Sequence, residues 1–596
     1  MKKYLTITLS LLIACTALAQ DKRLKNVDKD LNALLKSTKV PGFAVAVVEN
    51  DKVIYARGFG YRDYENKTPV DANTLFAIGS SSKAFTCSIL GLLKSEGKLA
   101  FSDSPLKYVP GLKFYNNDLN NDIIIEDLMS HRTGLPRHDW SWYFFPTHDK
   151  DSRVQRIQYQ EPFTGLRQQW HYNNFMFLVQ GVIAEKITGK SWEDNIRERF
   201  LVPLEMNRTN VSIAEMKEAS NAAFGYELDD KGGLSKMDYY DIAAMAPAGS
   251  INSSANDMAN WLITWIGKGK FKGKEIIPES YITEAMSSHA VVHGGLPGKE
   301  MPNTFLANYG YGWFLSSYKG NYRVEHGGNI DGFSASVVLF PASDIGIVVL
   351  VNENNSSVPS LVRNTIADRL LDVKKTDWNA KYLEEEKKSK ETEKPAKKAE
   401  EPVNNTPSHP LDSYTGLFTN PGYGTFEIVR QSDSLFANFK HLRFFLKHKH
   451  YDVFSPYDAT EAEIDTSEDT DGLFMNFTTN DAGEIASVKL KAEQTLDHPI
   501  EFKRKPKEVA VAVDVVNAYV GSYEISGMEV KVYVKNEKLY LFVPGQPEYE
   551  LTPVSKNMYV ITALDGFKVE FVSGNDGKVK EIVLHQPNGT FSAARK

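Results

Sequence analysis

The 596-residue sequence predicts an α+β domain followed by a β-rich region. Three observations predict this organisation. Residues from about 24 to 375 mix helical and strand patterns, a charged stretch interrupted by proline follows, and residues from about 410 onwards alternate apolar and polar side chains between Asn, Asp and Gly turns. With 42% hydrophobic and 24% charged residues, most of the chain has a globular composition, and its length predicts two to four domains.

Residues 1–19 have the pattern of a bacterial signal peptide. Two lysines precede a short apolar stretch, and residues 17–19 form an A-x-A cleavage site. The run LIAC at residues 12–15 instead resembles the lipobox of bacterial lipoproteins. We therefore expect an exported chain, which is periplasmic or secreted after cleavage, or tethered to a membrane if Cys15 is acylated.

The first domain, predicted at residues 24–375, has strands near both ends. Two short apolar strands at residues 43–56 are joined by a polar turn, and residues 334–351 form a second hairpin. Residues 359–373 follow with apolar side chains three and four apart, as in an amphipathic helix. Strands at both ends and helices between them predict one antiparallel sheet flanked by helices and closed by both termini, with a helical insert.

Residues 376–408 are predicted to be a linker because they are charged, interrupted by proline and nearly free of apolar residues. Two β-modules are predicted beyond it, at residues 409–506 and 507–596. The pattern Tyr-x-Gly-x-aromatic at residues 414–418 recurs about 105 residues later, at residues 519–523, and alternating apolar segments follow each copy. Two separate β-modules, or one barrel built from two halves, both fit this repeat.

Composition also narrows the function. The formal net charge is −7 and no long basic run is present, which argues against a nucleic-acid partner. Cys15 and Cys87 are the two cysteines, so the processed chain cannot form an internal disulfide. No later apolar run reaches the roughly eighteen residues of a transmembrane helix.

Several other site types are not expected from the sequence. It contains no P-loop, no G-x-G-x-x-G in a β-α-β context and no G-x-S-x-G elbow, which argues against an α/β-hydrolase. The pairs His448/His450 and His289/His293 have no third ligand nearby in sequence, so we expect no metal site.

The strongest local motif is the S-x-x-K of residues 80–83. Ser80 and Lys83 are three residues apart and lie on the same face of a helix. A serine hydroxyl needs a nearby base to become a nucleophile, and a lysine can serve if burial and other cations lower its pKa. The helix N-terminus also favours the negative charge that develops on the serine oxygen. Ser81 and Ser82 have no lysine at this spacing. Alone, the motif is common by chance.

Two further clusters follow in the chain. A Y-x-N motif contains Tyr172 and Asn174, and an H-x-G motif contains His326 and Gly328, just before an apolar strand. With these three elements in this order, the sequence resembles the S-x-x-K serine hydrolases, a β-lactamase-related and penicillin-binding-protein family that includes class C β-lactamases, D-alanyl-D-alanine carboxypeptidases, D-aminopeptidases and esterases. The resemblance covers residues 25–372 and implies a β-lactamase/transpeptidase-like fold. Similar supporting stretches lie at residues 128–135, 247–251 and 309–313.

The resemblance implies catalytic roles for three side chains. Ser80 is the nucleophile that becomes acylated, while Lys83 and Tyr172 share the proton transfers. The backbone N–H groups of Ser80 and Asn329 form the oxyanion hole, and such a donor is worth roughly 3 kcal/mol in the transition state. His131 and Arg132, within the first supporting stretch, are expected to order the helical insert rather than to take part in catalysis.

The resemblance also implies substrate-binding roles for Asn174, His326 and Gly328. Asn174 positions the substrate amide or ester, and Gly328 lets the substrate backbone pack against the strand. His326 stands where lysine is usual, and histidine is only partly charged near neutral pH. Because β-lactamases use that fixed charge against a substrate carboxylate, H-x-G favours esterases, D-residue aminopeptidases or acyltransferases.

We therefore expect an acyl-enzyme mechanism without a cofactor, acting on a small ester, amide or D-residue peptide. Three alternatives stay open: an acyltransferase with an alcohol or amine acceptor, a slow-turnover penicillin-binding sensor, and a structural partner whose catalytic residues are relics. The C-terminal modules resemble the lipocalin-like β-barrels often appended to such hydrolases. They are expected to cover the active-site mouth, to bind a partner or to act as a spacer.

Overall fold

The computed structural model describes residues 21–596 apart from residues 230–231, 300–302, 304, 393–405, 461–463, 465–472 and 565. The predicted signal peptide, Cys15 and part of the predicted linker lie outside the described residues. The chain divides into two compact units. Unit 1 comprises Met1–Leu112, Asn117–Gly134 and Thr164–Pro395, and unit 2 comprises Lys113–Asn116, Leu135–Phe163 and Ala396–Lys596. None of the helices described is both long and apolar enough to cross a bilayer.

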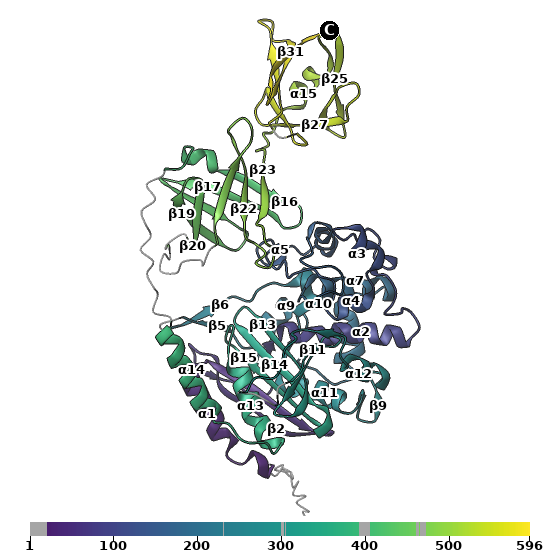
Figure 1. Ribbon diagram of the computed structural model, residues 1–596, viewed down its shortest axis with the longest axis vertical. Coiled ribbons are helices and arrows are strands. Elements are labelled where there is room, and N and C mark those ends of the chain that lie inside the picture. The colour runs from purple at the N-terminus through teal and green to yellow at the C-terminus, as the bar shows by residue number, and fades with distance from the viewer. Residues whose placement is uncertain are drawn as a thin grey trace, which may run out of the picture. The chain divides into compact units, whose positions relative to one another are not determined.

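Unit 1 is built on a nine-stranded antiparallel sheet in the order β10-β11-β12-β13-β14-β15-β1-β2-β3 (Figure 1). Both predicted hairpins are present, and β1 pairs with β15, so the two ends of the unit meet in the middle of the sheet. The α+β class and the sheet closed by both termini are thereby confirmed. The strands are β1 (Gly42–Glu49), β2 (Lys52–Asp63), β3 (Thr68–Pro69), β10 (Ala290–Val291), β11 (Ala307–Tyr309), β12 (Phe314–Tyr318), β13 (Asn321–Ile330), β14 (Phe333–Phe340) and β15 (Ile345–Val351).

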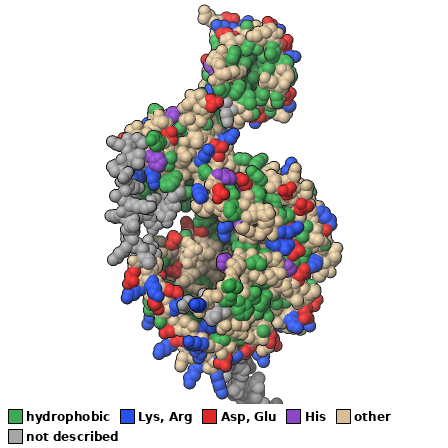
Figure 2. Space-filling view, viewed as in Figure 1, with side chains coloured by type: hydrophobic (Ala, Val, Ile, Leu, Met, Phe, Trp, Pro, Cys, Tyr) green, Lys and Arg blue, Asp and Glu red, His purple; other side chains and the backbone are tan. Residues whose placement is uncertain are grey.

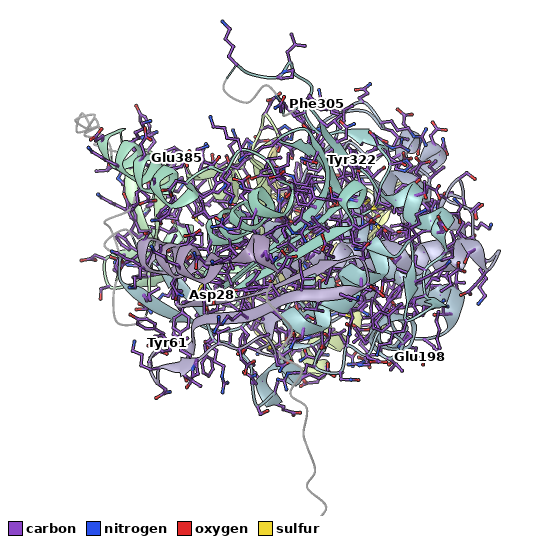
Figure 3. The ribbon with its side chains drawn as sticks, turned by 90° about the horizontal axis from the view of Figure 1, so that it is seen from below. Asp28, Tyr61, Glu198, Phe305, Tyr322 and Glu385 are labelled. Carbon is purple, nitrogen blue, oxygen red and sulfur yellow. The ribbon has the colours of Figure 1, made fainter. Side chains whose placement is uncertain are left out.

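Helices cover both faces of this sheet, which is why β14 and β15 read as continuous apolar runs. α1 (Val27–Thr38) and α13 (Val358–Leu370) share one apolar core with alternate residues of β1 and β15. α11 (Ala255–Ile266) packs on the opposite face, where Gly346 leaves room for Leu262. Figure 3 labels Asp28 on α1, whose carboxylate accepts a hydrogen bond from Tyr55 of β2.

Most helices of unit 1 come from the part of the chain between β3 and β10. α2 (Lys83–Ser95) and α7 (Phe175–Thr188) pack against each other and are apolar around most of their circumference, as buried helices are. The predicted linker starts as a helix, α14 (Trp378–Thr392). The shorter helices of unit 1 are α3 (Asn117–Asp122), α4 (Ile125–Met129), α8 (Trp192–Ile196), α9 (Ile213–Glu218), α10 (Ala246–Gly249) and α12 (Glu279–Ala285). Its short strand pairs are β4 (Phe76–Ala77) with β7 (Asn252–Ser253), β5 (Gly225–Leu228) with β6 (Leu234–Met237), and β8 (Lys270–Phe271) with β9 (Lys274–Glu275).

The β-rich C-terminal region forms two closed barrels of consecutive antiparallel strands, so the repeat corresponds to two barrels rather than to two halves of one. The first barrel contains β16 (Gly416–Asn420), β17 (Gly424–Gln431), β18 (Ser434–Asn438), β19 (Arg443–His450), β20 (Val453–Asp458), β21 (Met475–Thr479), β22 (Ile485–Leu490) and β23 (Ile500–Lys505). The second contains β24 (Gly521–Ile525), β25 (Met528–Lys535), β26 (Lys538–Phe542), β27 (Glu548–Pro553), β28 (Met558–Ile561), β29 (Lys568–Ser573), β30 (Val579–Gln586) and β31 (Gly589–Arg595), with α15 (Val513–Tyr519) before it.

The two barrels share one strand register. Phe418 pairs with Phe426 in the first barrel, and Tyr523 pairs with Val530 in the second. Each last strand carries an arginine, Arg504 or Arg595, that donates to a backbone carbonyl just before the first strand of its barrel. This equivalence explains the repeat in the sequence and allows positions in one barrel to be compared with those in the other.

Residues 135–163 lie in unit 2, although the sequence predicts them to be part of the first domain. They contain two short helices, α5 (Trp140–Tyr143) and α6 (Lys150–Gln155), and they pack with the first barrel. The predicted helical insert is therefore divided between the two units.

Candidate active site

Ser80 lies at the start of the helix that carries the S-x-x-K motif. The 3₁₀ turn η2 (Gly79–Ser82) leads directly into α2, and a hydrogen bond from the Ile78 N–H to the Ile251 carbonyl holds its entry. The Ser81 hydroxyl donates to the His326 carbonyl, and the Ser82 hydroxyl accepts from the Ile251 N–H. Both of those serines are buried in structural contacts, whereas Ser80 remains partly exposed.

Lys83 is fully buried and faces Ser80. Its Nζ lies 2.9 Å from Ser80 Oγ, 2.8 Å from Asn174 Oδ1 and 2.8 Å from the Ala248 carbonyl oxygen. The Lys83 amine is thus a meeting point for α2, for α10 and for Asn174, which is the residue before α7. The structure brings together the S-x-x-K motif, the asparagine of Y-x-N and the supporting stretch at residues 247–251.

The Tyr172 ring also lies close to this amine. Lys83 Nζ is 4.8 Å from the centroid of the Tyr172 ring, and the His131 ring centroid is 4.4 Å from it. His131 Nδ1 accepts a hydrogen bond from the Asn173 N–H, and the His131 carbonyl accepts one from the His171 N–H. His131 therefore packs directly against the Y-x-N segment, a contact that the sequence did not reveal beyond the similarity of the stretch around it.

His326 is 2% exposed, and protein groups contact both ring nitrogens. Nδ1 lies 2.6 Å from the Gly327 carbonyl oxygen and Nε2 lies 3.0 Å from the Tyr309 hydroxyl. Because a carbonyl can only accept, Nδ1 carries the hydrogen, and in the neutral ring Nε2 accepts from Tyr309. Burial, followed by the nearby Lys83 charge, lowers the His326 pKa to about 3. The ring is neutral near pH 7, and substrate can bond to a ring nitrogen only by displacing one of these contacts.

The oxyanion-hole candidates lie where β13 passes η2. A Cβ on Gly328 would lie 1.9 Å from the Ile78 carbonyl oxygen and 3.1 Å from the Ser80 nitrogen, so only glycine fits this crossing. A Cβ on Gly79 would lie 2.9 Å from the Asn329 nitrogen. Ser80 is the second residue of its turn, and an N–H there has no acceptor within the helix. The two close approaches bring the backbone around Ser80 next to that around Asn329.

The Asn329 side chain points to a neighbouring loop. Its Oδ1 accepts from the Ser334 hydroxyl and from the Asn355 N–H, and its Nδ2 donates to Asn354. These contacts fix the end of β13, which carries the Asn329 N–H, the second candidate donor.

A shallow, open depression adjoins these elements. It borders Ala77, three residues before Ser80, and Ile330, the residue after Asn329. Aromatic and aliphatic side chains dominate its lining, with Tyr239, Tyr240, Ile242 and Phe333 among them. The surface on this side of the nucleophile segment is therefore mainly apolar.

Among the residues described, no three His, Cys, Asp or Glu side chains lie close enough together to hold a metal ion. In the His289/His293 pair, the His289 ring contacts Glu126 and the Glu284 carbonyl. In the His448/His450 pair, the His448 ring lies beside the Tyr451 carbonyl.

The antiparallel sheet flanked by helices, with a serine and a buried lysine at the head of α2, defines the penicillin-binding-protein class of fold. The chain belongs to the β-lactamase family, whose model matches residues 27–371. A second family model, a domain of unknown function called DUF3471, matches twice, at residues 400–504 and 505–594. The predicted recognition and the β-lactamase/transpeptidase-like fold class are confirmed.

Known proteins agree with this assignment. The chain is 29% identical over 428 residues to an unguisins hydrolase of Aspergillus campestris, covering 68% of this chain and 78% of that one. It is 28% identical over 353 residues to protein flp of Staphylococcus aureus, covering 59% and 67%. The octameric penicillin-binding protein homologue from Pyrococcus abyssi superposes with a TM-score of 0.54 at 21% identity, covering 81% of this chain and all of that one, and so supports the fold. Family membership identifies the chain as a serine hydrolase at the level of the family.

Proposed function

We propose that this chain is an exported hydrolase that forms an acyl-enzyme on Ser80 and acts on a small ester, amide or D-residue peptide. The observation that carries the proposal is the 2.9 Å contact between the buried Lys83 amine and Ser80 Oγ at the head of α2. Export rests on the signal-peptide pattern of residues 1–19. The hydrolase name of the Aspergillus relative supports the reaction class.

Acylation begins with proton transfer from Ser80 Oγ to Lys83 Nζ. In its neutral form the amine has one lone pair for that proton and two N–H groups for Asn174 Oδ1 and the Ala248 carbonyl, so its contacts match a base held in place. Ser80 Oγ attacks the substrate carbonyl, and the Ser80 and Asn329 amides receive the oxyanion. The bond to the leaving alcohol or amine then breaks as that group takes up a proton.

Tyr172 completes the proton transfers. Its ring packs against both Lys83 Nζ and the His131 ring, which restricts its orientation. We assign Tyr172 two proton transfers. It donates a proton to the leaving group, and it later removes a proton from the water that attacks the acyl carbonyl. That attack releases the acid and returns the proton to Ser80.

The neutral state of His326 bears on the substrate. A fixed cation at this position would pair with a substrate carboxylate, and a neutral buried imidazole supplies none. The depression beside Ala77 and Ile330 has a mainly apolar lining. Both features favour uncharged esters and amides over anionic β-lactams.

The test is turnover by the mature full-length protein beside its Ser80→Ala variant. The panel contains a p-nitrophenyl ester, D-residue amides, a D-alanyl-D-alanine peptide and a chromogenic cephalosporin. Ser95→Ala, at the far end of the same helix, is the matched control. We expect turnover and an acyl adduct by intact mass in wild type and control, and neither in Ser80→Ala.

The same experiment separates the rival functions. A stable adduct without product indicates a slow-turnover sensor, and product that appears only with an added alcohol or amine indicates an acyltransferase. Absence of both turnover and adduct across the panel contradicts the enzyme proposal.

A further inference from the structure

An aromatic side chain from outside the strands completes the core of the first barrel. Phe145, which follows α5, is 6% exposed and belongs to the apolar core that the barrel strands form. Its ring centroid lies 5.8 Å from that of Phe502 and 5.5 Å from that of Phe439. Trp140 and Phe144 pack against the same core. Figure 1 shows α5 beside the strands of this barrel.

Buried polar contacts fix how this segment docks. The His138 N–H donates to Glu493 Oε2 at 2.6 Å, and His138 Nδ1 lies 2.8 Å from the Tyr423 hydroxyl. The Ser141 hydroxyl donates to the Gly422 carbonyl at 2.6 Å. Buried hydrogen bonds have strict geometry, so residues 135–163 dock in one defined position rather than through loose apolar contact.

The second barrel provides an internal comparison. A Cβ on Gly424 would lie 2.7 Å from the Phe145 ring, and Gly424 also has a φ of 149°, so this position accepts only glycine. In the shared register, Gly424 stands two residues before Phe426, and Met528 stands two residues before Val530. Met528 is 44% exposed, and apolar side chains are visible on the surface of the second barrel (Figure 2). Only the first barrel has the glycine that receives Phe145.

The same segment is anchored at its other end in unit 1. Its outgoing arm ends at Gly134 and its returning arm starts at Thr164, and three backbone hydrogen bonds join the arms: Thr164 to Gly134, Arg167 to Arg132, and His171 to His131. Asp127, whose side chain is fully buried, binds the guanidinium groups of both Arg132 and Arg167. The paired arms lead directly to Tyr172, whose ring contacts that of His131 in a tilted arrangement.

We propose that the first barrel is a positioning element for Tyr172. By holding residues 135–163 in one conformation, it fixes the two arms that carry His131 and Tyr172 beside Lys83. The proposal rests on the proposed function, because Tyr172 is a catalytic residue only if Ser80 and Lys83 form the acyl-enzyme. Phe145 and Gly424 are positioning residues, since they act through the arms and not on the substrate.

The physical reason is conformational entropy. Residues 135–163 contain the short helices α5 and α6 and one 3₁₀ turn, and Trp140, Phe144 and Phe145 pack in the barrel core, so the segment depends on the barrel to bury these rings. Without the barrel, residues 135–163 sample many conformations. Their motion opens the backbone hydrogen bonds between the two arms next to Tyr172. A misplaced Tyr172 slows the chemical steps and leaves substrate binding nearly unchanged.

The test compares Phe145→Ala and Gly424→Leu with wild type in the full-length protein. Phe145→Ala removes the docked ring, and Gly424→Leu blocks its place. Met528→Ala, at the equivalent position of the second barrel, is the matched control. Hydrogen exchange is followed in peptides covering residues 131–134 and 164–173, together with kcat and KM for the best ester of the panel.

Phe145→Ala and Gly424→Leu are each expected to speed hydrogen exchange at these arms at least tenfold and to lower kcat about tenfold. Their KM is expected to stay within twofold of wild type. Met528→Ala is expected to match wild type in exchange, kcat and KM. Faster exchange confined to residues 138–160, with unchanged arms and kcat, overturns the proposal. If a variant unfolds the first barrel and hydrogen exchange at the arms is still unchanged, that result also overturns the proposal. If wild type turns over no substrate, the proposed function fails, while exchange at the arms still decides whether the barrel holds them.

Discussion

Replacing His326 tests whether its ring is held neutral inside the fold. The His326 pKa is about 3 in the folded chain, against 6.5 for an unperturbed histidine. Between these values the unfolded chain binds a proton that the folded chain does not, so the free energy of unfolding falls as the pH falls. One proton corresponds to about 1.4 kcal/mol per pH unit, or roughly 2 to 3 kcal/mol between pH 6 and pH 4.

The assay is denaturant unfolding at pH 4, 5, 6 and 7 of wild type and His326→Gln, followed by tryptophan fluorescence. His293→Gln, an exposed position in the same unit, is the control. The variant is expected to lose less stability than wild type on acidification, by about 1.4 kcal/mol per pH unit below pH 6. The slope is the prediction, because the substitution also changes stability by a constant amount. Parallel curves would show that the ring is protonated in the fold or open to water, and would remove the case for an uncharged substrate.

Three further changes test the remaining parts of the site. Lys83→Ala is expected to slow acylation of Ser80 by a factor on the order of 10² to 10⁴, as measured by intact mass against time, and acylation at the wild-type rate would exclude Lys83 as the base. Gly328→Ala is expected to lower kcat/KM for the same ester at least tenfold, because its Cβ would lie 1.9 Å from the Ile78 carbonyl and displace the oxyanion donors. Activity equal to wild type would place the oxyanion hole elsewhere. Asp127→Asn is expected to lower the free energy of unfolding by about 2 kcal/mol, because two guanidinium groups lose their buried partner, and an unchanged thermal midpoint would contradict that.

The residues of the candidate site could be selected from the sequence because each motif is short and local. Ser80 and Lys83 are one helical turn apart, and Asn174 immediately precedes α7, so the backbone positions of all three are set by nearby sequence. The sheet was predictable for a related reason: its central hairpins are runs of β-branched and other apolar residues joined by polar turns. The repeat predicted the β-rich C-terminal region, but it fitted either two β-modules or one barrel built from two halves, and the structure shows two closed barrels.

Contacts between distant residues were not predictable. His326 is neutral because Tyr309 and the surrounding fold enclose it, which its own H-x-G motif does not indicate. The aromatic run that contains Phe145 has the composition of any buried helix, so the sequence placed it in the first domain. Its partner Tyr423 is 285 residues from His138, and no local pattern records a contact over that separation.

The docking of residues 135–163 also sets an order of events during synthesis. About 285 residues separate His138 from its partner in the first barrel, and at 5 to 20 residues per second the ribosome needs on the order of half a minute to produce them. Until then Phe144 and Phe145 lack the core that buries them, and they remain a surface for premature association or for a chaperone. A chain interrupted between residues 330 and 505 therefore carries a complete set of motif residues together with an unburied aromatic segment, which marks it as unfinished.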